Sequence, residues 1–166
     1  MNTLIDKISS YNLFNYLLPG ILFVALGEKL TSFSLMPPNL ITALFLYYFI
    51  GLIISRIGSL TVEPILKTSK ILQFASRKDF VKASESDPKI EILSEQNNMY
   101  RTLCSMSIIL IVLVVYDQIK PNVPWGTHVN GIVFLVALTV LFVFSYRKQT
   151  RYISERVAIA QGNQTE

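Results

Sequence analysis

The chain has 166 residues, of which 51% are hydrophobic and only 16% are charged, and its net charge is +4. Soluble domains usually carry about a quarter charged residues, so this composition argues against an ordinary soluble fold. The single cysteine, Cys104, excludes an intrachain disulfide and a multi-cysteine metal site.

Four segments contain no charged residue at all: 8–27, 30–55, 102–116 and 121–146. A helix of a soluble protein needs a polar face, whereas about 18 or more consecutive apolar residues indicate a transmembrane helix. Three of the four segments reach that length. We therefore predict an all-α polytopic membrane protein with four transmembrane helices and a helical cytoplasmic loop between the second and the third.

The first transmembrane helix is expected at residues 13–30, after an amphipathic lead-in at residues 1–12. We expect it to be retained rather than cleaved as a signal peptide, because the leading positive charge is weak. Pro19 and Gly20 lie inside it. A kink there would leave backbone groups unpaired, so this helix is expected to pack against protein on that side.

The second span is expected at residues 40–60, after a tight outer turn at Met36–Asn39 that contains two prolines. Glu63-Pro64 then either ends that helix or begins the next one, with proline in the first turn. Apolar residues between Ile65 and Ala75 recur at helical spacing and predict a further helix with one apolar side.

Asp87-Pro88 marks a break, and from Ile90 the spacing predicts one helix that continues into the third span. That span, residues 103–116, is short. The uncharged segment that contains it rises about 22 Å, against a hydrocarbon core of about 30 Å, so Arg101 is expected to snorkel to the interface.

The fourth span is expected at residues 129–146, following a second outer turn flanked by Tyr116 and Trp125 as interfacial anchors. Residues 161–166 read as a disordered tail. The chain is thus expected to divide into a lead-in with two spans at residues 1–60, a cytoplasmic helical segment at 61–101, two further spans at 102–147 and a cytoplasmic tail at 148–166.

The basic residues predict the orientation. Twelve of the fifteen lysines and arginines lie in residues 56–101 or after residue 146, and the two short outer loops together hold two. The positive-inside rule therefore places both termini and the central loop in the cytoplasm. An even number of spans agrees with this, and we expect the chain in a bacterial inner membrane.

Small residues recur along the end of the second span: Gly51, Ser55 and Ser59 every fourth position, with Gly58 beside them. Small side chains at this spacing let helices approach closely in lipid. We interpret them as a helix-packing or oligomer contact, within or between subunits of a homo-oligomer.

Arg56 and Glu63 lie seven positions apart, which puts them on one face if the helix is regular. Three interpretations stay open. Arg56 is a snorkelling arginine beside a loop carboxylate; the two residues form an ion pair or Arg56 contacts a neighbouring subunit; or the arginine contacts a lipid headgroup.

A basic cluster follows in the central loop and comprises Lys67, Lys70, Arg77, Lys78 and Lys82, opposed by Asp79. Anionic membrane lipid is the first partner that this charge predicts, and a cytosolic protein is the second. Direct binding of nucleic acid is not expected, because no aromatic residues are interleaved with the charge.

No catalytic constellation is found. The sequence has no glycine-rich phosphate loop, zinc-ligand spacing or nucleophile elbow. His128 is the only histidine and is expected to be an interfacial hydrogen bonder, and Cys104 a packing residue. We therefore expect a non-enzymatic protein with no cofactor, no metal and no small-molecule substrate.

The overall plan resembles the membrane subunit of the Kiwa anti-phage defence system. The resemblance covers the segments from Tyr11 to Gly20 and from Ser55 to Pro64 and the four-span arrangement of the whole chain. It implies a homo-oligomeric bundle that senses disturbance of the inner membrane during phage attachment. It also implies a cytosolic DNA-binding partner docked on the inward-facing loop and tail, and no catalytic residues.

These observations favour a sensor or scaffold that anchors a cytosolic partner at the membrane. A small pore-forming or membrane-disrupting effector is the alternative, although polar residues within the spans are sparse for a conducting bundle. A transporter fits least well, since no ionisable residue lies near the middle of a span.

Overall fold

A computed structural model of the protein describes residues 13–120, 123–124 and 126–162. The described residues form α-helices and two π-helical turns, and no strand occurs among them, which confirms the predicted all-α class. The elements in chain order are η1 (Leu13–Leu17), α2 (Leu18–Leu30), α3 (Leu40–Ile57), η2 (Gly58–Val62), α4 (Glu63–Thr68), α5 (Arg77–Ser86), α6 (Lys89–Gln118) and α7 (Val129–Gly162). The predicted lead-in at residues 1–12, the anchor Trp125 and the end of the predicted tail at 163–166 lie outside the described residues.

Three helical stretches are long and apolar enough to cross a membrane, namely Leu40–Thr68, Lys89–Gln118 and Val129–Gly162. They indicate a membrane protein. The 13-residue helix α2 is not among them. The first of the four expected spans therefore stays a prediction.

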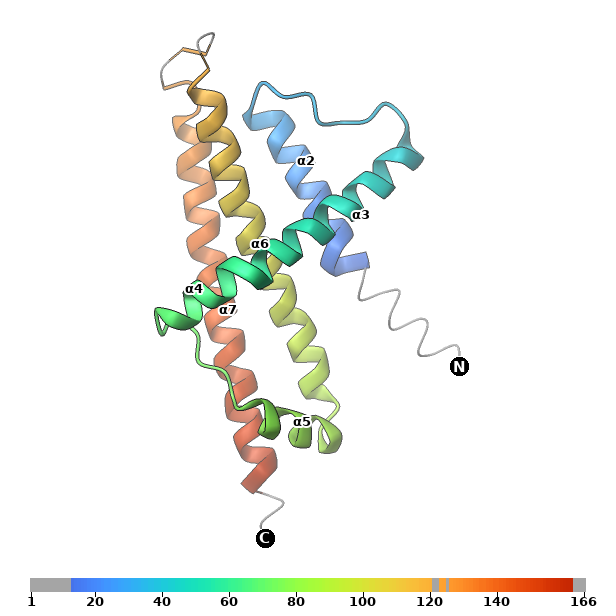
Figure 1. Cartoon of the computed structure of the whole chain (residues 1–166), viewed down its shortest axis with the longest axis vertical. Coiled ribbons are helices and arrows are strands. Elements are labelled where there is room, and N and C mark those ends of the chain that lie inside the picture. Colours follow the sequence, from blue (N-terminus) through green and yellow to red (C-terminus); the bar gives the residue numbers. More distant parts are fainter. Residues whose placement is uncertain (1–12, 121–122, 125, 163–166) are drawn as a thin grey trace.

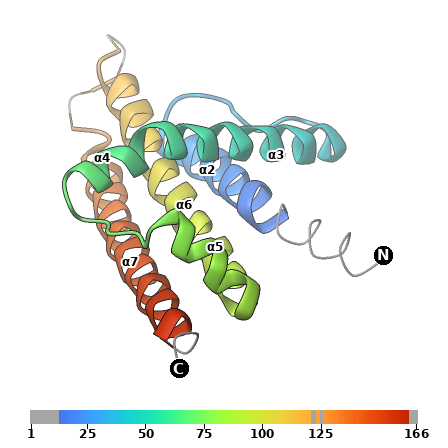
Figure 2. The ribbon, with the colours of Figure 1, turned by 60° about the horizontal axis from the view of Figure 1, so that its bottom comes forward.

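The two longest helices, α6 and α7, run side by side along the molecule, and α2 and α3 cross each other beside them (Figure 1). Helix α6 is central, because it contacts α7 on one side and both α2 and α3 on the other. Helix α3 is inclined steeply to the α6–α7 pair, and its N-terminal end projects away from that pair (Figure 2).

The buried apolar residues form three clusters along the α6–α7 pair. The first comprises Ile54, Leu103, Met106, Leu110, Val114 and Leu135. The second comprises Val62, Leu66, Leu72, Cys104 and Tyr146. The third comprises Ala83, Ile90, Ile153 and Val157 and joins α5 to α6 and α7. Cys104 is fully buried in the second cluster.

Helix α6 has 30 residues and α7 has 34. They are therefore about 45 Å and 51 Å long, well beyond a hydrocarbon core of about 30 Å. The apolar run that looked short for a third span is only the upper part of a longer helix whose lower part is polar. The segment boundaries expected after residues 60, 101 and 147 all fall inside continuous helices.

The helix predicted between Ile65 and Ala75 is wrong beyond Thr68, where α4 ends. Lys70 adopts a left-handed backbone with φ of 59°. The Lys70 amide donates to the Lys67 carbonyl at 3.1 Å and the Ile71 amide to the Leu66 carbonyl at 3.0 Å, which is the Schellman way of ending a helix. The apolar residues after this turn belong to a loop, in which Leu72 is buried in the second cluster.

The outer turn expected at Met36–Asn39 belongs to a longer loop, because α2 ends at Leu30 and α3 begins at Leu40. The Asn39 side chain caps α3 by accepting from the amide of Ile41 at 2.9 Å. The carboxylate of Glu28 accepts from the backbone amides of Leu35 and Met36. This loop is therefore held by side chains rather than by a tight proline turn.

Candidate functional site

Two glycines set the crossing of the first helices. A Cβ atom on Gly51 would lie 1.7 Å from the carbonyl oxygen of Tyr16, and one on Gly20 would lie 1.8 Å from that of Tyr47. The backbones of η1–α2 and α3 thus touch at two reciprocal points of an antiparallel crossing. The segment at Pro19 and Gly20 packs against protein, and its partner is α3 of the same chain.

The small residues below Gly51 face α6. The hydroxyl of Thr102 donates to the Ser55 hydroxyl at 3.3 Å. A Cβ atom on Gly58 would lie 2.2 Å from Ser105 Oγ. Gly51, Ser55 and Gly58 therefore contact other helices of their own chain, whereas Ser59 is half-buried.

At the level where the apolar part of the molecule ends, Glu63 binds two other helices. Arg101 Nη1 of α6 donates to Glu63 Oε2 at 2.7 Å, and the Tyr146 hydroxyl of α7 donates to the same oxygen at 3.1 Å. The Arg101 side chain is 16% exposed, so it lies inside the helix bundle rather than snorkelling as expected. We call these three residues the boundary cluster.

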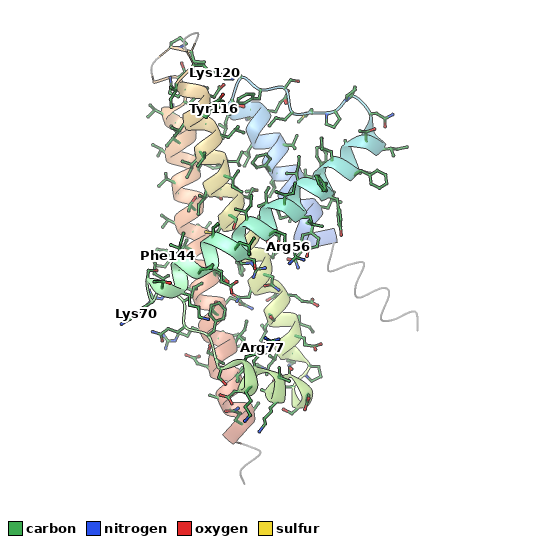
Figure 3. The ribbon with its side chains drawn as sticks, viewed as in Figure 1. Arg56, Lys70, Arg77, Tyr116, Lys120 and Phe144 are labelled. Atoms are coloured by element: carbon green, nitrogen blue, oxygen red, sulfur yellow. The ribbon has the colours of Figure 1, made fainter. Side chains whose placement is uncertain are left out.

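Of the three interpretations of Arg56, the ion pair with Glu63 is not found among the described residues. Arg56 is exposed, and none of the described residues forms an ion pair with it. Figure 3 shows Arg56 and Lys70 on opposite sides of the α6–α7 pair. The cause is η2, since a π-helical turn needs more residues for each rotation than an α-helix. It turns Glu63 away from the face of Arg56 and towards α6 and α7.

Below the boundary cluster, residues 69–101 and 147–162 form what we call the polar platform. The Thr150 hydroxyl donates to the side-chain Oδ1 of the buried Asn97 at 3.1 Å, which joins α7 to α6. Arg156 of α7 pairs with Asp87, which follows α5. The hydrogen bond from Arg156 holds the pKa of Asp87 below its usual range.

The predicted basic cluster divides into two groups on or next to this platform, and all five of its side chains are exposed. Arg77, Lys78 and Lys82 share α5. Lys67 and Lys70 lie at the end of α4, where Lys67 Nζ is 5.7 Å from the centre of the Phe74 ring. The structure thus brings three of the five together on one helix.

A groove of about 620 Å³ runs along α7 beside the linker that follows α4. Its lining combines basic, hydroxyl, acidic and apolar side chains. The principal polar ones are Lys70, Ser76, Asp79, Arg147, Arg151, Ser154 and Glu155. Arg147 and Arg151 were not among the expected site residues, and their position directly after an uncharged run is the signal that could have found them.

On the opposite end of the bundle, Asp117 is a fully buried carboxylate that sequence reasoning missed. It accepts from the backbone amide of Ser32 at 2.7 Å and lies 2.8 Å from Lys120 Nζ and 3.0 Å from His128 Nε2. Asp117, near the end of α6, therefore joins the loop after α2 to His128, the residue before α7. Among the described residues no group of three or more His, Cys, Asp or Glu side chains could hold a metal ion.

Polar side chains within the apolar parts of α6 and α7 bond to their own helices. Ser105 donates to the Arg101 carbonyl at 2.9 Å, Ser107 to the Leu103 carbonyl at 2.9 Å and Thr139 to the Leu135 carbonyl at 2.8 Å. These hydroxyls are satisfied without water, which does not favour a polar pore lining.

No protein-family model, curated protein or solved structure matches this chain. Its class is defined by its own structure: a helical membrane protein whose two longest helices carry a polar platform beyond their apolar parts. The functional conclusion is built from that arrangement.

Proposed function

We propose that the protein is a non-enzymatic sensor or scaffold of the bacterial inner membrane that anchors a cytosolic protein on its polar platform. The observation that carries this proposal is the continuation of α6 and α7 as a pair for about 20 Å beyond their apolar parts. Spanning a bilayer does not require this extension. Internal contacts join α5 to it, and they leave the basic side chains of α5 exposed.

The proposed topology has four spans with both termini in the cytoplasm. The basic residues on the polar platform support this orientation by the positive-inside rule. A first span is supported by η1 and α2, which together form a helical stretch from Leu13 to Leu30. Such a stretch is about 27 Å long, close to the thickness of the hydrocarbon core.

The sensing part of the proposal rests on α3. Its N-terminal half exposes Leu40 and Phe45, each 74% exposed in the isolated chain, and these side chains suit contact with lipid. The other end of the same helical stretch carries Glu63, which binds Arg101 and Tyr146. A change in the bilayer that tilts α3 would therefore be transmitted to α6 and α7 at the top of the platform.

We further propose that the protein forms a homo-oligomer. The stripe of Gly51, Ser55 and Gly58 packs within the chain, so other surfaces have to join the copies. Exposed apolar side chains on α3 and α7, such as Phe49 and Phe144, are available for this contact as well as for lipid. The mass of the detergent-solubilised protein, corrected for bound detergent, tests this point.

The partner is tested by affinity purification of the tagged protein from its native host, followed by quantitative mass spectrometry. We expect a soluble protein that co-purifies with the wild type and is lost from R77E/K78E/K82E. The control is K89E/K148E, which changes two other exposed basic residues of the platform. Equal recovery of every soluble protein by the wild type and by R77E/K78E/K82E would refute docking on α5.

The resemblance to the Kiwa membrane subunit extends the proposal to anti-phage defence with a DNA-binding partner. Plating of phages on cells with and without the intact locus tests it. Protection that requires this protein and is reduced by R77E/K78E/K82E supports the role, and an unchanged plating efficiency after its deletion, across a diverse phage panel, contradicts it.

A further inference from the structure

The groove along α7 has its cations gathered near the apolar part of the molecule. Arg147 follows the uncharged run directly, and Arg151 lies one turn, about 6 Å, below it. Lys70 faces the same groove from the linker. The acidic Asp79 belongs to α5 and is hydrogen-bonded to Ser76 and Gln161, which places it near the far end of α7.

Glu155 is the nearer acid, and it pairs with Arg151 at 2.8 Å. Both side chains are largely exposed, so this pair contributes little and can be exchanged for another anion. Arg147 and Lys70 form no ion pair with any described residue. The membrane-proximal end of the groove therefore has cationic side chains available for an anionic ligand.

The register of α7 connects this groove to the lipid-facing surface. Val140, Phe144, Arg147 and Arg151 are spaced by three or four residues and therefore share one helical face. Val140 and Phe144 are 48% and 62% exposed. Figure 3 shows Phe144 on the same side of the α6–α7 pair as Lys70. An acyl chain lying along Val140 and Phe144 would thus continue into the cationic end of the groove.

Lys70 is an independent observation at the same place. It occupies the left-handed position that ends α4, where glycine is preferred because a Cβ atom is strained there. A residue with a side chain at such a position is consistent with a use beyond folding. Lys70 lines the groove together with two arginines and two hydroxyls, Ser76 and Ser154.

We propose that Lys70, Arg147 and Arg151 bind the phosphate of an anionic phospholipid from the leaflet nearest the polar platform. Guanidinium and ammonium groups are the side chains that recognise phosphate, and Arg147 lies at the level of the headgroups. The acyl chains lie along α7 and the headgroup enters the groove. This inference goes beyond the anchoring of a protein partner, because it requires none.

The test uses the purified full-length protein in mild detergent. Native mass spectrometry measures retention of phosphatidylglycerol against phosphatidylcholine, and thermal unfolding measures the shift in Tm that each lipid produces. The variants are K70G and R147Q/R151Q. K89Q/K148Q is the matched control, because it removes two exposed cations of the platform that do not line the groove.

We expect at least fivefold more phosphatidylglycerol than phosphatidylcholine on the wild type and on K89Q/K148Q, and loss of this preference in both groove variants. K70G is expected to unfold at the same or a higher Tm without lipid, so its loss of binding cannot be ascribed to misfolding. Equal retention of the two lipids by the wild type, or an unchanged preference in the groove variants, overturns the proposal. If glycerol phosphate alone gives the same Tm shift at the same concentration, the site takes a soluble phosphate and the lipid assignment is wrong.

Discussion

Glu63 and Arg101 are 38 positions apart in the sequence and are joined by an ion pair of 2.7 Å. The pair connects the end of the α3–α4 stretch to the middle of α6, with the Tyr146 hydroxyl on the same carboxylate oxygen. It lies where the apolar parts of these helices end. It therefore fixes the positions of α4, α6 and α7 along their axes relative to one another.

Replacing Glu63 by glutamine is expected to lower the free energy of unfolding by about 1–3 kcal/mol, because Arg101 is left as a largely buried charge without its partner. The measurement is reversible unfolding in detergent. R56Q is the control and should change stability by less than about 0.5 kcal/mol, since Arg56 is exposed. If E63Q, R101Q and the double variant show additive losses, the two residues are not coupled.

Alanine at Gly51 is expected to destabilise the protein by about 1–3 kcal/mol or to separate α2 from α3, because its Cβ would overlap the Tyr16 carbonyl. Thermal unfolding in detergent measures this. G162A is the matched control, since no atom of the described residues lies within 4 Å of a Cβ at Gly162. An equal Tm for G51A and G162A contradicts the close crossing.

Glycine at position 70 is expected to raise the free energy of unfolding by about 0.5–1 kcal/mol, because the left-handed backbone of Lys70 is strained for a residue with a side chain. K67G is the contrasting control. Lys67 lies within α4, where glycine costs about 1 kcal/mol. A lower stability for K70G than for the wild type would show that the lysine side chain contributes more than its backbone costs.

Lowering the pH is expected to reduce the stability of the polar platform, because Asp87 becomes protonated. Its pKa is depressed in the folded protein, chiefly by the hydrogen bond from Arg156. The resulting stability is present above the unfolded-state value of 3.8 and is lost as the pH falls through the lower folded value. Unfolding followed from pH 6 to pH 3 should show a loss that is smaller in D87N and in R156Q, whereas an identical pH dependence in all three proteins assigns the loss to other groups.

Much of the helical plan follows from the sequence. The uncharged run after Tyr100 and the three- and four-residue spacing before it predict one helix across the boundary, and α6 is continuous from Lys89 to Gln118. Local spacing succeeds here because Ile90, Asn97 and Cys104, which lie seven positions apart, are all buried. The same rule fails in the loop after α4, where Leu72 is buried and Ile71 is partly buried.

The charged contacts were not predictable in this way. Seven positions separate Arg56 from Glu63 on any helix, but one π-helical turn changes which face the second residue occupies. Asp117 shows the same limitation, because its partners Ser32 and His128 come from two other segments. Which charges meet depends on the crossing of helices, and spacing along one helix does not report it.

By itself, the sequence determined that this chain is helical, that its long uncharged runs suit lipid, and that its basic residues gather beside those runs. These properties follow from the transfer of side chains between water and hydrocarbon, which acts on each segment separately. Only the tertiary structure decided that Glu63 binds Arg101, that Gly20 and Gly51 hold α2 against α3, and that Lys70 and Arg147 share a groove. Each of these contacts joins segments distant in the chain, and their geometry is fixed by packing.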